Sequence, residues 1–176
     1  MARRALTGVL LVGGASSRYG SPKALATIDG ETLADRGRRV LAGACDEVLV
    51  VGKAGELPFD VLDDGGGALR APIVGVVAGL RAAAHDVTVV LPVDCPWVTP
   101  ELLRLLGERC RDAAVPQTGP LPGAWARSAL PVLERRLAAG GPLALYRAYD
   151  ELDVVTVEVE PQLVADVDTP ADLTPT

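Results

Sequence analysis

Short apolar runs alternate with helical segments along almost the whole of this 176-residue chain. The runs are Leu6–Val12, Glu47–Val51, Val87–Val93 and Val154–Val159. They are rich in β-branched residues and have few polar positions, which is typical of strands buried on both faces in a parallel sheet. Parallel neighbours need right-handed helical crossovers, and these place helices on the faces of the sheet. The pattern therefore predicts a doubly wound α/β fold.

Helical patterns occupy the segments between these runs. The predicted helices are Leu25–Leu41, Gly75–Ala84, a helix opened by Thr99 and Pro100, and Arg127–Ala139. Thr99 as N-cap with Pro100 at the first helical position is a strong start signal. Pro116–Trp125 is rich in Gly and Pro, so we expect a loop there.

The composition excludes some classes of function. Hydrophobic residues make up 49% of the chain but aromatic residues only 3%, so the core is expected to be aliphatic. There are 17 basic and 23 acidic side chains, giving a net charge of -6. A chain of this charge lacks the broad positive field that supplies most nucleic-acid affinity, so we expect no nucleic-acid partner. Any phosphate that it binds must be neutralised locally.

Cysteine usage and the first residues bear on the compartment. Cys45, Cys95 and Cys110 are odd in number and form no C-x-x-C pair, which argues against a disulfide framework and a zinc site. The start, Met1-Ala-Arg-Arg before an apolar run, is compatible with a twin-arginine secretion signal or with a first buried strand. Because the next residues, Gly13–Lys23, form a candidate functional loop, we expect the strand. We therefore expect a cytoplasmic protein, and no apolar run has the length of a membrane span.

The loop after the first strand carries the most informative pattern, Leu10-Leu-Val-Gly-Gly-Ala-Ser-Ser-Arg-Tyr-Gly-Ser-Pro-Lys23. Gly13 and Gly14 allow a close approach of the backbone, and successive N–H groups of such a loop can surround phosphate oxygens. Arg18 and Lys23 can neutralise the phosphate charge. The spacing matches neither a Walker A loop nor G-x-G-x-x-G. The alternative is a plain turn between a strand and a helix with solvated basic residues.

Asp94 follows the run Val87–Val93 at what should be the carboxyl end of a buried strand. A carboxylate there is costly unless a cation or hydrogen-bond donors accompany it. Mg²⁺ prefers oxygen ligands, so Asp94 is a candidate metal ligand. It could instead cap the following helix, although Thr99 is the better cap.

Further carboxylates near the end of the chain add to this pattern. Alternation places Asp166 and Asp168 on one side of a predicted short strand, before a helix start at Thr169. Asp168 can cap that helix or complete a carboxylate pair around a divalent ion with Asp94.

Asp63 and Asp64 are either turn residues or ribose-binding acids. His85 is the only histidine, and we assign it no role. With no second histidine and no Ser/His/Asp set, nucleophilic hydrolysis is not indicated.

Four motifs resemble, in order, those of the molybdenum cofactor guanylyltransferases, within the nucleotidyltransferase superfamily. The first, Leu11-Val-Gly-Gly-Ala-Ser-Ser-Arg-Tyr-Gly-Ser-Pro-Lys23, is similar to the family's L-A-G-G-x-S-x-R-M-G-x-D-K. The others are Ala71-Pro-Ile-Val-Gly75, Val93-Asp94-Cys-Pro-Trp-Val98 and Asp166-Val-Asp168-Thr-Pro-Ala-Asp172-Leu, which resemble G-P-L-A-G, C-D-x-P-hydrophobic and N-x-N-T-P-x-D-L. The resemblance spans almost the whole chain.

The resemblance implies a single Rossmann-like three-layer nucleotidyltransferase domain over residues 1–176, with a mostly parallel central sheet. It implies an enzyme that transfers GMP from GTP to molybdopterin carrying molybdenum, releases pyrophosphate and requires Mg²⁺. A transient contact with the apo-molybdoenzyme that receives the product is a further implied partnership, whereas no membrane partner is implied.

Site residues carry over by position. Leu11, Val12, Gly13 and Gly14 approach the nucleotide through main-chain groups, and Asp64 stands in the place of the family's nucleotide-binding acid. The candidate catalytic residues are Arg18 and Lys23, on the triphosphate, and Asp94, which holds Mg²⁺ together with Asp168. The region Gly119–Trp125 with Arg127 falls where the pterin should dock, and Trp125 either stacks on the pterin or belongs to the core.

The chain departs from the family pattern at several positions. Val12, Tyr19, Pro22 and Ala71 stand where Ala, Met, Asp and Gly are usual, and the last motif has Asp in place of Asn. The second predicted strand ends in Gly52-Lys53, without the Asn that the family has near the nucleotide. The alternatives are a cytidylyltransferase, a sugar-phosphate nucleotidyltransferase and a non-catalytic delivery protein. Gly13-Gly14 and Pro72-x-x-Gly75 favour guanine.

Overall fold

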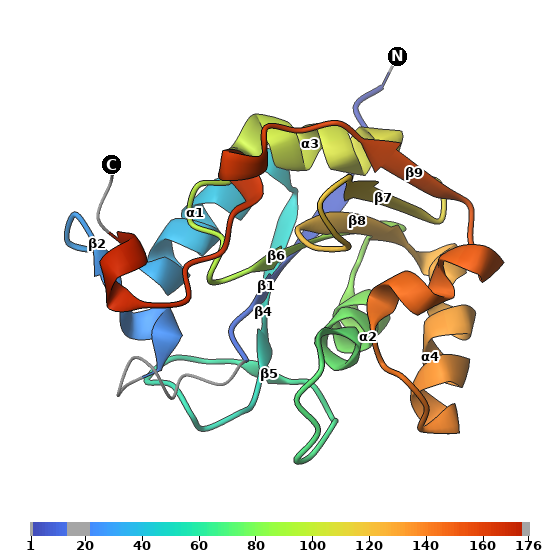
Figure 1. Ribbon diagram of the computed structural model, residues 1–176, viewed down its shortest axis with the longest axis horizontal. Helices are drawn as coiled ribbons and strands as arrows, with labels where there is room; N and C mark the ends of the chain where they lie inside the picture. Colours follow the sequence, from blue (N-terminus) through green and yellow to red (C-terminus); the bar gives the residue numbers. More distant parts are fainter. Residues whose placement is uncertain (1, 14–21, 174–176) are drawn as a thin grey trace.

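The first strand, β1 (Leu6–Leu11), is an interior strand of the sheet and is buried at every residue. It pairs in parallel with β4 (Glu47–Gly52) on one side and with β6 (Val87–Pro92) on the other. The computed structural model describes residues 2–13 and 22–173, and within these residues the main sheet has seven strands in the order β5-β4-β1-β6-β8-β7-β9 (Figure 1). The predicted α/β fold is confirmed.

The remaining strands extend the sheet on both sides. They are β5 (Leu62–Asp63), β7 (Ala113–Pro116), β8 (Gly123–Ala126) and β9 (Val154–Val157). β5 pairs in parallel with β4, and β9 pairs in parallel with β7. Only β8 runs against its neighbours, β6 and β7. The sheet is therefore mostly parallel, as predicted.

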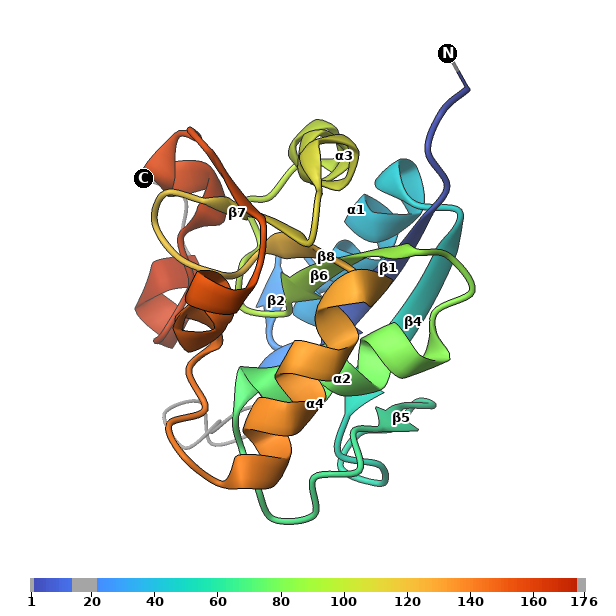
Figure 2. The same ribbon diagram turned by 90° about the vertical axis from the view of Figure 1, so that its right-hand side faces the viewer.

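Helices cover both faces of the sheet and complete three layers (Figures 1 and 2). α1 (Leu33–Ala44) and α3 (Pro100–Arg109) pack together on one face, and α2 (Pro72–Ala82) and α4 (Leu130–Ala139) pack together on the other. Each face has its own apolar cluster. The predicted start of α3 is confirmed, because the Thr99 side chain accepts a hydrogen bond from the N–H of Leu102 at 3.3 Å.

The predicted helix Leu25–Leu41 is wrong in its first two turns. Lys23–Leu25 is a short 3-10 helix, and a two-stranded hairpin of β2 (Thr27–Ile28) and β3 (Glu31–Thr32) follows it. The hairpin turns at Asp29 and Gly30, whose φ angles are 51° and 82°. Asp-Gly is a favoured pair for a two-residue hairpin turn with positive φ, so turn chemistry outweighs the helical spacing here.

The predicted loop Pro116–Trp125 is shorter than expected, because the strands β7 and β8 flank it. Both strands consist mainly of small residues and are buried at every position. They lack the β-branched pattern used to find the other strands, and their neighbours in the sheet stabilise them instead. Trp125 is fully buried in β8, so the stacking role considered for it is wrong and it belongs to the core.

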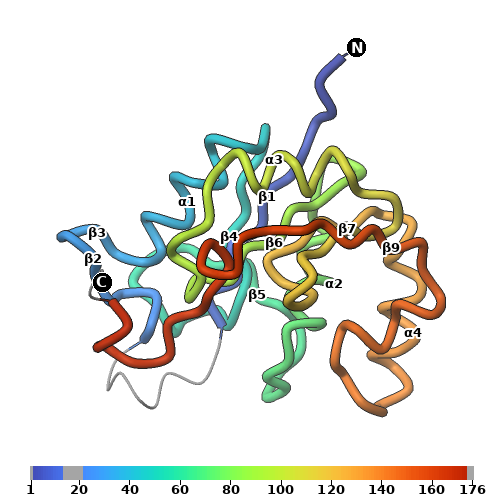
Figure 3. Tube along the Cα trace, turned by 45° about the horizontal axis from the view of Figure 1, so that its top comes forward, coloured from blue at the N-terminus to red at the C-terminus, as the bar shows by residue number. Residues whose placement is uncertain are grey.

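After β9, the C-terminal segment crosses the molecule towards the hairpin of β2 and β3 (Figures 1 and 3). The further 3-10 helices are Arg127–Ala129, Leu145–Glu151, Pro161–Val164 and Pro170–Leu173. The predicted short strand at Asp166–Asp168 is wrong, since the segment is coil. It is attached to the end of β6 by the N–H of Val167, which donates to the carbonyl of Asp94 at 2.8 Å. Among the described residues, no helix has both the length and the apolar character needed to cross a bilayer.

Three helices contact β1 through glycines. A Cβ atom added at Gly37 of α1 would lie 2.5 Å from Leu10, and one at Gly107 of α3 would lie 2.5 Å from Leu6. On the other face, a Cβ at Gly79 of α2 would lie 2.8 Å from a methyl group of Val9. These distances are below normal contact, so each helix packs this closely on the strand only because the side chain is absent.

We predict that Gly79→Ala destabilises the fold by about 1–2 kcal/mol. Overpacking costs roughly 1–3 kcal/mol, and the better helix propensity of Ala offsets up to about 1 kcal/mol of this. Val9 is β-branched and fully buried, so it cannot rotate away. Urea unfolding followed by circular dichroism measures the change.

The control is the same substitution in a Val9→Ala background. There the added methyl group has space, and Gly79→Ala is expected to be neutral or stabilising. An equal loss of stability in both backgrounds would contradict the steric explanation.

Candidate active site

The candidate site lies where the chain reverses its direction of travel across the sheet. From β1 the chain moves outwards to β4 and β5, and it then returns to β6 on the other side of β1. Ligands of open parallel sheets bind beyond the carboxyl ends of the strands at such a point. Here the strands are followed by Val12 and Gly13, by Lys53, and by Val93 and Asp94.

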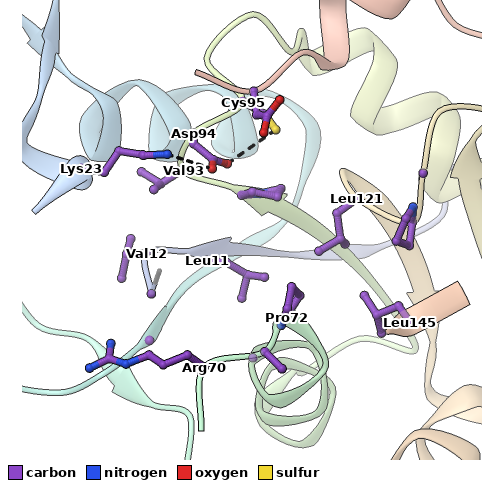
Figure 4. Close-up of a pocket in the computed structure, with 18 of the residues that line it drawn as sticks. Leu11, Val12, Lys23, Arg70, Pro72, Val93, Asp94, Cys95, Leu121 and Leu145 are labelled. Carbon is purple, nitrogen blue, oxygen red and sulfur yellow. Dashed lines mark hydrogen bonds and ion pairs between the residues drawn. The ribbon is translucent and has the colours of Figure 1, made fainter. Parts of the chain in front are cut away.

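A cavity of about 890 Å³ occupies this position. Its first wall, which we call the α2 wall, is formed by residues 11–13, 51–53, 64, 69–72 and 75. Its second wall is formed by residues 118–121, 144–146, 161, 164 and 165. Lys23, residues 92–95, Asp166 and Asp168 also line it. In Figure 4, Lys23 and Asp94 lie opposite Arg70 and Pro72, with Leu121 and Leu145 at one end.

Charged side chains of both signs line this cavity, with Lys23, Lys53 and Arg70 set among four aspartates. The sequence contains two lysines, Lys23 and Lys53, and both line the cavity. α2 also begins here, and its first-turn residues Pro72 and Gly75 are lining residues. The amino end of an α-helix carries partial positive charge and favours anions. The start of α2 and these three cationic side chains are therefore the groups that can attract an anion here.

Lys23 links three segments of the cavity. Its Nζ donates to the carbonyl of Val167 at 2.9 Å and to Oδ2 of Asp94 at 3.4 Å. It also lies 3.8 Å from a carboxylate oxygen of Asp168. The side chain is only 14% exposed. These contacts hold the ammonium group beside the end of β6 (Figure 4).

Asp94 is a partly buried carboxylate between a positive neighbour, Lys23, and a negative one, Asp166. Burial raises its pKa, whereas Lys23 lowers it and the nearby charge of Asp166 raises it further. The Lys23 ammonium group thus compensates only part of the cost of the charge. Among the described residues, no three His, Cys, Asp or Glu side chains form a ready-made metal cage. Asp94 with Asp168 offers carboxylate oxygens but leaves other coordination positions to a ligand.

The α2 wall contains a buried ion pair. Lys53 Nζ lies 2.7 Å from Oδ1 of Asp64, and each side chain is only 9% exposed. Oδ1 of Asp64 also accepts the N–H of Gly66 at 2.9 Å. Sequence reasoning singled out Asp64 but noticed Lys53 only as a departure from the family pattern. Its signal was a lysine directly after a buried strand.

The two neighbouring aspartates have different roles, which the sequence left open. Asp63 accepts the N–H groups of Gly65 at 2.8 Å and Ala54 at 3.1 Å, so it is a turn residue. Asp64 lines the cavity and pairs with Lys53.

Most of the predicted site residues converge on this cavity. Leu11, Val12, Gly13, Lys23, Asp64, Asp94 and Asp168 all line it. Gly14 and Arg18 lie outside the described residues. The N–H groups of Asp168 and Thr169 are bound by the carboxylate of Asp172, at 3.0 and 2.8 Å, while the carboxylate of Asp168 faces Lys23.

The expectation that Arg127 lies beside the pterin is wrong. Because β8 is antiparallel to β6, the end of β8 lies at the start of β6, and the cavity is at the opposite edge. Arg127 donates there to the carbonyl of Ala83 at 2.8 Å. It lies 3.6 Å from Asp86, at the start of the same strand.

The family model of the MobA-like NTP transferase domain matches residues 8–153. The chain belongs to this family. A molybdenum cofactor guanylyltransferase of Desulfosudis oleivorans is 30% identical over 183 residues, which cover 92% of this chain and 88% of that protein. One of Acidiphilium cryptum is 31% identical, with coverage of 96% and 92%. This MobA-like protein is therefore a nucleotidyltransferase enzyme.

A solved structure of a similar protein has the same fold. The molybdopterin-guanine dinucleotide biosynthesis protein A of Archaeoglobus fulgidus superposes on this MobA-like protein with a TM-score of 0.77 at 25% identity. The match covers 95% of this chain and 94% of that one.

We predict that Lys53→Met destabilises this MobA-like protein by about 3–5 kcal/mol. Removing one partner of a buried ion pair leaves the other charge buried without compensation. Equilibrium unfolding in urea measures the loss.

The matched variant is Lys53→Met combined with Asp64→Asn. It removes both charges and keeps an oxygen for the N–H of Gly66, so its stability is expected to exceed that of the single variant. A double variant as unstable as Lys53→Met alone would contradict an electrostatic origin of the loss.

Proposed function

We propose that this nucleotidyltransferase transfers GMP from GTP to molybdopterin carrying molybdenum and releases pyrophosphate. The observation that carries the proposal is one cavity at the carboxyl edge of the sheet with two different walls. The α2 wall carries charge and a helix start, and the second wall is largely apolar. The names of the two similar guanylyltransferases support this choice of substrates.

The nucleotide is assigned to the α2 wall. A Cβ atom at Gly52 would lie 2.9 Å from Val12, so a glycine lets the ends of β1 and β4 lie together and form the floor of this wall. Leu11 to Gly13 then offer main-chain groups to the nucleotide. The start of α2 and Lys23 offer positive charge to the triphosphate.

The residues present fit a Mg²⁺ ion that is completed by substrate. Mg²⁺ is commonly held by one or two carboxylates together with substrate phosphates. Asp94 and Asp168 would hold it, and the incomplete compensation of Asp94 by Lys23 favours a further cation there. When bound, the ion supplies charge stabilisation to the phosphates.

The transfer requires one bond to form and one to break. A terminal phosphate oxygen of molybdopterin attacks the α-phosphorus of GTP, and pyrophosphate leaves with the electron pair of the broken P–O bond. The protein's contribution is to hold the two substrates in line and to place the Lys23 ammonium group near the developing charge. No covalent bond to the chain is needed. Delivery of the product to an apo-molybdoenzyme stays a prediction from the family.

We predict that Lys23→Ala and Asp94→Ala each lower the rate of pyrophosphate release by roughly 100- to 1,000-fold. This is the usual effect of removing a preorganised charged group from a transition state. Initial rates with GTP, Mg²⁺ and molybdopterin measure it.

Asp86→Ala is the control for loss of a carboxylate, because the Asp86 side chain is 92% exposed and lies at the opposite edge of the sheet. It is expected to react at the wild-type rate. Near-normal turnover by a folded Asp94→Ala variant would exclude the proposed role of Asp94.

The choice between guanine and cytosine as the base of the nucleotide needs a separate test, because of the lysine at position 53. Lys53 stands at the end of β4, where the resemblance places an asparagine near the nucleotide, so the base could be cytosine. We expect GTP with Mg²⁺ to raise the melting temperature more than CTP, ATP or UTP does. A larger shift with CTP would favour a cytidylyltransferase.

A further inference from the structure

Large apolar side chains are exposed at few places in the described part of the chain. They are Leu62, Leu69, Leu105 and Tyr146, with exposures from 39% to 53%. Two of the four line the cavity, Leu69 in the α2 wall and Tyr146 in the second wall. Tyr146 is the most exposed, at 53%. An aromatic ring that is half exposed at a cavity is a surface that a ligand can cover.

The backbone of Tyr146 is anchored, although its side chain is exposed. The ring lies on the 3-10 helix Leu145–Glu151, whose residues Leu145 and Ala148 are buried and anchor it to the domain. The guanidinium of Arg147 lies over the ring, 5.4 Å from its centroid. A guanidinium over an exposed ring is weakly attracted to it and makes its surroundings more positive. Tyr146 thus presents an exposed aromatic ring on an anchored backbone, beside a cation.

The neighbours of Tyr146 in the second wall extend this apolar surface. Leu121 comes from the loop between β7 and β8, Leu145 from the same 3-10 helix, and Pro161 and Val164 from the segment after β9. Three distant parts of the sequence therefore converge on one side of the cavity. In Figure 4, Leu121 and Leu145 lie at the end of the cavity away from Lys23.

We propose that Tyr146 stacks on the pterin ring of the acceptor and determines the affinity for that substrate. The inference rests on the proposed function and assigns a residue to the acceptor side of the site. A planar heteroaromatic ring complements the exposed tyrosine face and the apolar wall, because offset stacking between such rings is favourable. An anionic group on the same molecule complements Lys23, which lines the same cavity. An acceptor with a ring at one end and a phosphate at the other matches both features.

This assignment differs from the sequence analysis, which left Trp125 open between stacking on the pterin and a place in the core. Trp125 is fully buried in the sheet and has no surface for a ligand. Tyr146 lies 21 positions further along the sequence. It belongs to a segment with no motif of its own, so only the fold brings it to the cavity.

The test compares Tyr146→Ala, Tyr146→Phe and wild type in steady-state pyrophosphate release. Loss of one stacked ring should raise KM for molybdopterin by roughly 5- to 100-fold and leave KM for GTP within about twofold. Tyr146→Phe keeps the ring and should stay close to wild type. Leu105→Ala, at an exposed apolar residue of α3 that is not in the cavity, is the control and should change neither KM.

A second measurement is independent of turnover. Binding of 6-hydroxymethylpterin phosphate is followed through the fluorescence anisotropy of the pterin, which reports binding whether or not the ring partner quenches the emission. Tighter binding by wild type and by Tyr146→Phe than by Tyr146→Ala supports the inference, even if GTP proves to be the wrong nucleotide. Equal KM values for molybdopterin, or equal affinity for the pterin, in Tyr146→Ala and wild type would overturn it. Absence of pyrophosphate release by wild type with every nucleotide would instead overturn the proposed function.

Discussion

The close packing of helices on β1 is the constraint on which the rest of the structure depends. Leu6 and Leu10 fill the space left by glycines of α3 and α1, and Val9 fills the space left by Gly79 of α2. Interiors packed at this density transmit small changes in position. The end of β1 is therefore fixed from both faces, and it forms the floor of the cavity. The proposed chemistry needs Leu11 to Gly13 to be held in place, and the packing of the helices on Leu6, Val9 and Leu10, earlier in the same strand, contributes to this.

Electrostatics imposes a second constraint. Both lysines of this chain line the cavity, and each is paired there with aspartate, Lys53 with Asp64 and Lys23 with Asp94 and Asp168. The arginines described by the structure are largely engaged elsewhere, in surface ion pairs such as Arg81 with Glu134. Partly buried charges act at short range in a medium that screens them less than water does. The proposed binding of a nucleotide therefore depends on the start of α2 and on the cations inside the cavity, and not on the net charge of the protein.

The α/β class and the parallel core strands follow from residue pattern alone, because a strand covered on both faces must be apolar throughout. The sequence analysis did not predict the hairpin at Asp29. The pair Asp29-Gly30, which favours a tight turn, lies within a stretch whose apolar residues have helical spacing. β7 and β8 were missed because alanine and glycine carry little strand preference, and only neighbouring strands make them favourable there. In the site, Lys23, Asp64 and Asp94 were found because they follow strands or belong to motifs. Lys53 also follows a strand and had the same local signal, but its pairing with Asp64 depends on the fold. Tyr146 belongs to no motif, and only the arrangement of distant segments brings it to the cavity.

The cavity is completed by the C-terminal segment, which is synthesised last. Val167 binds the carbonyl of Asp94 through its N–H and the ammonium group of Lys23 through its carbonyl, so a residue far along the sequence joins two parts of the site. The region matched by the family model ends before it, at residue 153. Once β8 has been made, every strand from β5 to β7 in the order of the sheet has a partner, while Asp94 and Lys23 still lack their link through Val167. The cavity is therefore completed only by the last part of the chain to be synthesised.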